Sequence, residues 1–235
     1  MRSYLLLLYR LVIYNVKVIF GNKFVYFVAA AFLFFAFIIM IAIFDDDPDF
    51  NEALIYGFLV FPGLLLIFYP MAYGIQNDDD AKMLETIFGI PNYRYKVWLV
   101  RFTLTIGIAG VILAVLAGIA NLTLYRFSTF PMVGQVLFPV AFLSSLAFML
   151  STLIRNGNGT AIVLVIVSFV FFIFSEPLRY SAYNIFLNPF SEPRDMSEFI
   201  WLTVIYKNRL YLVILSVLCL LYGMFNLQFR EKFVS

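Results

Sequence analysis

The chain has 235 residues, of which 63% are apolar, 20% aromatic and 13% charged, with a formal net charge of +2. Soluble domains are about 25% charged and about 45–50% apolar, so this chain has too little polar surface to cover a water-soluble core. The composition therefore excludes a soluble globular domain and predicts an integral membrane protein.

Residues 1–22 are apolar but contain basic side chains at Arg10 and Lys17, which share one helical face with Ser3 and Tyr14. This pattern predicts a helix that lies in the cytoplasmic membrane interface, with its basic groups toward lipid headgroups. The alternative is a first membrane span, in which Arg10 and Lys17 would each cost about 2.5–3.5 kcal/mol in lipid. No small-residue cleavage site follows, so we expect no cleavable signal peptide.

Six charge-free stretches follow, and each has about the 20 residues that are needed to cross the hydrocarbon layer. Continuous apolar runs lack the alternation of a membrane β-barrel, so the predicted fold is all-α, with six transmembrane helices. The charge-free stretches are 24–44, 54–75, 102–125, 127–154, 156–175 and 210–229. The last three spans are expected at 130–154, 158–175 and 208–229.

Basic residues predict the orientation. With the N-terminus inside, inner segments hold eleven Lys and Arg residues and outer segments hold five. The outer side also gathers Asp45, Asp46, Asp47, Asp49 and Glu52. This asymmetry obeys the positive-inside rule, and six spans return the chain to the side on which it started. We therefore expect both termini in the cytoplasm and a multi-pass protein in the cytoplasmic (inner) membrane of a bacterial cell.

Several kinds of chemistry are excluded by what the chain lacks. It has no His and one Cys, Cys219, so the common zinc and copper ligand sets and a Ser–His pair are unavailable. It also lacks a Gly-x-x-x-x-Gly-Lys-Ser/Thr phosphate loop, so it should not hydrolyse nucleotide. We expect no catalytic, metal or cofactor site and no nucleic-acid partner. The charge-free spans argue against a gradient-driven carrier, although sodium sites made of backbone carbonyls stay open.

One polar segment, 78–91, lies between two apolar spans on the predicted inner side. Its three aspartates, Asp78 to Asp80, predict an N-terminal cap for a helix from Ala81 to Phe88, which Gly89 and Pro91 end. Apolar residues on this short helix must be buried against the bundle, lipid or a partner. The predicted apolar residues are Leu84, Ile87 and Phe88.

The residues of this segment follow the order Leu84-Glu85, Ile87-Phe88, Pro91, Arg94 and Arg101, with acidic residues just upstream. This order resembles the cytoplasmic signature of type 2 ATP-binding-cassette (ABC) exporter permeases. The family often has Gly-Thr where this chain has Lys82-Met83. The likeness covers almost the whole chain, including the N-terminal helix, the six spans, the run from Ser144 to Arg155 into Asn-Gly-Asn-Gly, and the ending Arg230-Glu231-Lys232-Phe233.

The resemblance implies the membrane half of a transporter. Such permeases pair with a second permease subunit, as homodimers or heterodimers, and each binds a cytoplasmic ATPase subunit that holds ATP and Mg. Segment 78–91 would be the coupling helix that sits in a groove of that ATPase. The implied contact residues are Asp80, Lys82, Leu84, Glu85, Ile87, Phe88, Pro91 and Arg94. The alternative for Glu85 and Arg94 is an ordinary solvated pair worth about 0–1 kcal/mol.

The predicted outer segment, 176–207, contains Pro177, Pro189 and Pro193 and is expected to carry short helices. Residues 197–206 are too few to cross a membrane and too apolar to float, which predicts a re-entrant or interfacial helix. Alternatively, 199–229 is one long tilted helix, with Lys207 and Arg209 extending outward.

Three functions stay open from the sequence. The first is an ABC exporter permease, the second is a non-transporting membrane subunit that passes ATPase motion to envelope machinery, and the third is a gradient-driven carrier. The nature of the transported substrate is not encoded in any recognisable motif.

Overall fold

The structure is a computed structural model that describes residues 23–44, 50–80, 82–90, 92 and 94–229. The predicted interfacial helix at 1–22 and the ending 230–235 lie outside the described residues. The part of the chain that is described is helical and contains no strand.

Six helices in this part of the chain are long and apolar enough to cross a membrane. This confirms the predicted all-helical fold and agrees with a multi-pass membrane protein. Their bounds are α2, Phe24–Ile43; α3, Glu52–Asp80; α5, Val100–Thr123; α6, Thr129–Ile154; α7, Gly157–Ser175; and α8, Glu198–Asn226. A short helix, α4 (Leu84–Gly89), and a π-helix, η1 (Arg94–Leu99), connect α3 to α5.

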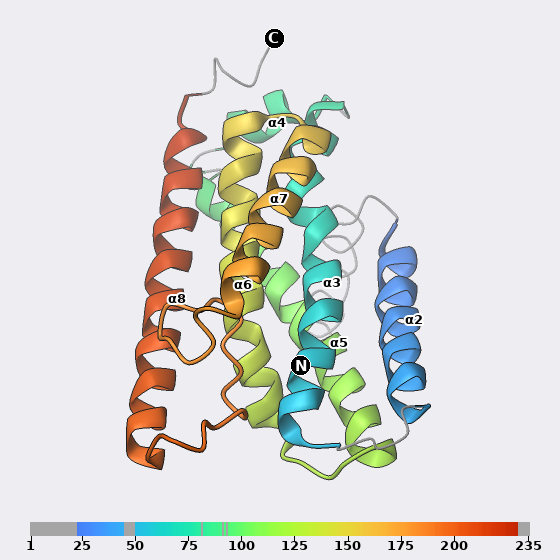
Figure 1. The fold of residues 1–235 in the computed structure, drawn as a ribbon. Coiled ribbons are helices and arrows are strands. Elements are labelled where there is room, and N and C mark those ends of the chain that lie inside the picture. Colours follow the sequence, from blue (N-terminus) through green and yellow to red (C-terminus); the bar gives the residue numbers. More distant parts are fainter. Residues whose placement is uncertain (1–22, 45–49, 81, 91, 93, 230–235) are drawn as a thin grey trace, which may run out of the picture.

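The six long helices run side by side, and α6 lies against α3, α5, α7 and α8 (Figure 1). Residues of α3 and α6 supply much of the buried core. These two helices approach closely at Gly63, where a Cβ atom would lie 2.8 Å from Cγ2 of Val140. Pro62 precedes this glycine and is itself buried, so the proline and the glycine together shape the α3–α6 contact.

The two ends of the bundle differ. At one end, the top in Figure 1, lie α4 and the turn between α6 and α7; we call this the α4 end. At the opposite end, α8 begins, and residues 176–197 connect α7 to it through turns; we call these residues the strap. The strap contains no helix, so the prediction of short helices in the outer segment was wrong for this stretch.

Two helices are longer than predicted. Both α3 and α8 have 29 residues, which at about 1.5 Å per residue is longer than a hydrocarbon layer of roughly 30 Å. Residues 198–207 belong to α8, so the continuous-helix alternative is correct and the re-entrant helix is not. Helix α3 likewise continues through Asp78 to Asp80, which were predicted to begin the next helix.

Candidate functional site

The turn between α3 and α4 ends one helix and does not cap the next. The N–H groups of Lys82 and Met83 donate to the carbonyl oxygens of Asp79 and Asp78, both at 2.8 Å. Lys82 has a φ of 54°, in the left-handed region. This is the Schellman pattern that closes a helix C-terminus. The predicted N-cap was therefore wrong, and α4 has no side-chain cap.

The short helix α4 has one buried face. Leu84 and Ile87 are 3% and 4% exposed and belong to the same buried cluster as the long helices. Little of either side chain is therefore open to a partner, and a direct partner contact of these two residues stays a prediction. Their role is to hold α4 on the bundle.

The outward surface of this segment is mostly polar. Asp80, Lys82 and Thr86 are exposed, as are Gly89 and Asn92. The side chains of Glu85, Phe88 and Arg94, and the whole of Pro91, lie outside the described residues. Of the predicted contact residues whose side chains the structure describes, Asp80 and Lys82 are thus exposed. The exposed surface also includes Met83 and Ile90, each 36% exposed.

An ion pair joins the end of α3 to the start of α5, the two long helices that α4 and η1 connect in sequence. Nη1 of Arg101 donates to Oδ2 of Asp78, and their side chains are 13% and 6% exposed. The Arg101 guanidinium also lies 5.0 Å from the ring centroid of Trp98, which is the geometry of a cation–π contact. Trp98 packs in turn against Phe148 of α6. Three helices and η1 therefore meet around this pair.

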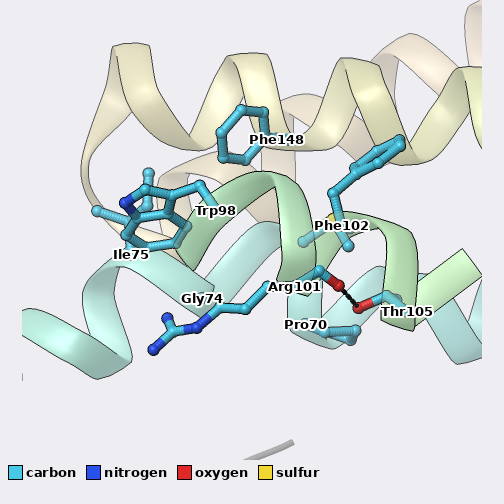
Figure 2. Close-up of a pocket in the computed structure, with 9 residues that line it drawn as sticks. Pro70, Gly74, Ile75, Trp98, Arg101, Phe102, Thr105 and Phe148 are labelled. Carbon is cyan, nitrogen blue, oxygen red and sulfur yellow. Dashed lines mark hydrogen bonds between the residues drawn. The ribbon is translucent and has the colours of Figure 1, made fainter. Parts of the chain in front are cut away.

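A small hollow lies next to the pair. Figure 2 shows its lining converging from α3 (Pro70, Gly74, Ile75), from η1 and α5 (Trp98, Arg101, Phe102, Thr105) and from α6 (Phe148). Its cavity volume of about 20 Å³ is room for about one water molecule and excludes a solute-sized ligand. A wider and more open hollow of about 420 Å³ lies between the start of α2 and the end of α3, with Lys23, Gln76 and Asp80 in its lining.

The turn between α6 and α7 packs onto α3 at the same end. Asn156 caps α7, because its Oδ1 accepts from the N–H of Gly159 at 2.9 Å. The N–H of Gly157 donates to Oε1 of Gln76, and the Tyr73 hydroxyl donates to Oδ1 of Asn158 at 3.0 Å. A Cβ on Gly157 would lie 2.3 Å from Cδ1 of Tyr73, so only glycine fits. We call α4, the end of α3, η1 and this turn the α4 platform.

A second polar cluster, which the sequence reading missed, lies at the strap end. Arg209 of α8 is 6% exposed and points into the bundle, so the prediction that it extends outward was wrong. It donates to Gln135 of α6, to Asn208 and to the carbonyl oxygen of Leu187 in the strap. Lys207 is exposed. The pair Asn208-Arg209, interrupting an apolar run, was the available signal.

No family profile, no curated protein and no solved structure matches this chain.

Proposed function

We propose that this chain is the transmembrane permease subunit of an ABC exporter, and that a separate cytoplasmic ATPase drives it through the α4 platform. The proposal unites the family resemblance of the sequence with one structural observation. That observation is the two-faced build of the α4 segment: Leu84 and Ile87 are buried in the bundle, while the exposed face carries the polar residues Asp80, Lys82, Thr86 and Asn92 beside Met83 and Ile90.

A force applied to α4 is transmitted to the rest of the bundle through its buried residues. Because Leu84 and Ile87 are packed into the core, α4 cannot move without displacing its neighbours. The Asp78–Arg101 pair fixes the end of α3 to the start of α5, on either side of α4. A force on the outer surface of α4 therefore reaches the buried cluster of the bundle through Leu84 and Ile87. In this proposal the α4 end faces the cytoplasm, and a second permease subunit completes the path for the substrate.

The buried pair also favours one other function. Carriers driven by an ion gradient place ionisable groups inside the bundle, and Asp78 is such a group. The charge-free spans argued against this class, but helix α3 extends beyond its predicted span and includes Asp78, and α5 includes Arg101. A gradient-driven carrier is thus the second candidate, and the following experiment separates the two.

The test uses the tagged chain purified in mild detergent from its native membrane. We expect a Mg-dependent ATPase to co-purify and its ATP hydrolysis to depend on the permease. Glu85→Lys, at a position implied by the family resemblance, should reduce the stimulation of hydrolysis while the permease stays folded. The same charge reversal at Glu192, an exposed strap residue, is the matched control and should have no effect.

Four outcomes are informative. Loss of stimulation with Glu85→Lys alone supports the proposal. Equal stimulation by Glu85→Lys and by wild type contradicts the α4 contact. Solute flux from vesicles that contain this chain alone, powered by an ion gradient, supports the carrier instead. Vesicles with both subunits and ATP but no efflux would favour the non-transporting subunit.

A further inference from the structure

The cluster around Arg209 contains a buried positive charge with neutral neighbours. Within the described residues, no carboxylate lies within 4.0 Å of its guanidinium. Its three acceptors are Oε1 of Gln135 at 2.7 Å, Oδ1 of Asn208 at 2.8 Å and the carbonyl oxygen of Leu187 at 3.3 Å. The guanidinium also lies 5.4 Å from the ring centroid of Phe138. A buried charge without a counter-charge is costly, so this arrangement calls for an explanation.

Hydrogen-bond donors exceed acceptors in this cluster. A guanidinium has five N–H donors and no acceptor, and the three hydrogen bonds above leave two N–H groups, one of which can donate to the oxygen of Tyr56. Tyr56 of α3, 2% exposed, interacts with the guanidinium. The guanidinium can donate to the Tyr56 hydroxyl oxygen but cannot accept its proton, and no described residue accepts a hydrogen bond from this hydroxyl. What this site still needs is an acceptor of hydrogen bonds.

The positive charge and the planar shape of the guanidinium indicate what kind of acceptor would fit. An anionic acceptor satisfies the free donors and also neutralises the buried charge. A guanidinium presents its N–H groups as a planar fork, which matches two oxygens of a carboxylate or phosphate better than a spherical ion. An arginine N–H and the Tyr56 O–H come from different helices, α8 and α3, so one bound group would join them.

The strap provides a polar approach to this cluster. A hollow of about 220 Å³ lies along it, lined by residues that include Asn184, Asn188 and the ion pair of Arg179 with Glu176, whose charged atoms lie 3.7 Å apart. Leu187, whose carbonyl accepts from Arg209, lies between Phe186 and Asn188, which both line the hollow. The hollow and the guanidinium thus both contact the strap at residues 186–188. Figure 1 shows the strap as the orange loop that leads from α7 to the start of α8.

We propose that Arg209 and Tyr56 form a binding site for an oxyanion, a carboxylate or a phosphate group, at the strap end of the bundle. The group belongs either to a small soluble anion or to a lipid headgroup. This site is separate from the α4 platform and does not depend on the chain being an ABC permease.

Thermal unfolding of the purified chain tests the site, because a ligand that binds the folded state raises its midpoint temperature. The protein is kept in a non-ionic detergent at constant ionic strength, with chloride as the reference anion. Three probes are titrated: acetate, inorganic phosphate and a short-chain phosphatidylglycerol. We expect at least one probe to raise the midpoint beyond the effect of chloride. A response to acetate or phosphate assigns a soluble anion, and a response to the lipid alone assigns a headgroup.

Variants separate binding from a purely structural role. Tyr56→Phe removes the free donor and should raise the half-saturating concentration of the effective probe about tenfold, the usual cost of one hydrogen bond to a charged group. If the hydroxyl has no ligand, the same variant leaves the response unchanged, and it even stabilises the chain by removing a buried unpaired group. Tyr206→Phe, at a 70% exposed position of α8, is the matched control and should respond like wild type.

Arg209→Lys keeps the charge but loses the fork, so it should also weaken the response where the variant folds. Two results overturn the proposal. One is the absence of any midpoint rise from all three probes relative to chloride. The other is a Tyr56→Phe variant with the same half-saturating concentration as wild type.

Discussion

The ion pair between Asp78 and Arg101 offers the most quantitative prediction. Removing Arg101 by substitution to Met leaves a buried carboxylate whose side chain is 6% exposed and has lost its partner. Breaking a buried pair in this way costs about 3–5 kcal/mol of unfolding free energy. The lost cation–π contact with Trp98 adds about 0.5–1 kcal/mol. Arg101→Met should therefore be among the most destabilising single changes at the α4 platform.

The double variant Asp78→Leu/Arg101→Met makes this prediction sharper. Replacing both partners with apolar residues removes the unpaired charge, so the double variant should recover most of the loss. In a double-mutant cycle, the coupling free energy between the two positions should exceed about 2 kcal/mol. In the proposed mechanism the recovered variant folds, yet it stimulates the ATPase less than wild type, because the rigid tie from α3 to α5 is gone.

Chemical unfolding in mixed micelles, followed by tryptophan fluorescence, measures these free energies. Trp98 lies beside the pair, and Trp201 lies in α8 near the strap end, so Trp201→Phe isolates the local signal. The reasoning is refuted if each single variant costs less than about 1 kcal/mol and the coupling is near zero. That result would describe a solvated pair.

Two further predictions concern the turns of the α4 platform. Gly157→Ala places a Cβ 2.3 Å from Cδ1 of Tyr73 and should cost about 1–3 kcal/mol of unfolding free energy, whereas Gly118→Ala, with open space around its Cβ, should cost nothing. Equal midpoints for these two variants in thermal unfolding would contradict the close packing of the α6–α7 turn. Lys82→Gly should raise stability by up to about 1 kcal/mol, because glycine adopts the left-handed φ of 54° without strain. A loss of stability in the same assay would mean that the lysine side chain holds this turn.

Sequence reasoning located the membrane-crossing helices well. Apolar runs of sufficient length leave few alternatives in lipid, and each predicted span lies on a long helix of the structure. The errors are at the ends of helices. The predicted spans stop at charged residues, whereas α3 and α8 continue into segments that contain them. Helix α3 continues to Asp80 because Asp78 is paired with Arg101, which lies 23 positions further along the chain. An ion pair between residues so far apart in the sequence produces no local sequence pattern from which it could be predicted.

The turn that ends α3 has a second feature that the sequence did not predict. The left-handed residue of its closing turn is Lys82, where glycine is the usual residue. The family that the sequence resembles often has Gly-Thr where this chain has Lys82-Met83, so this departure falls at the residue with the left-handed φ. Arg209 was missed for another reason. Its partners are neutral groups from distant segments, Gln135 and Leu187, and no charge pattern in the sequence connects them to it.

The burial of the α4 segment was predicted only in part. The apolar face of a short polar segment can be buried in several ways. The sequence did not distinguish burial against the bundle, against lipid or against a partner. Leu84 and Ile87 lie in the bundle. The polar residues around them carry the proposed partner contact, which depends on a second protein and is not determined by the fold of this chain.

The most direct test of the central claim is site-specific crosslinking from α4. Cys219 is the one cysteine of the chain, so Cys219→Ser gives a background for single-cysteine variants. Thr86→Cys places a thiol on the exposed side of α4, and Glu192→Cys places one on the strap as a control. With a short bifunctional reagent in native membranes, the account predicts a crosslink from position 86, and not from 192, to a protein that hydrolyses ATP. Crosslinks from 192 alone, or none from 86 while transport persists, would contradict it.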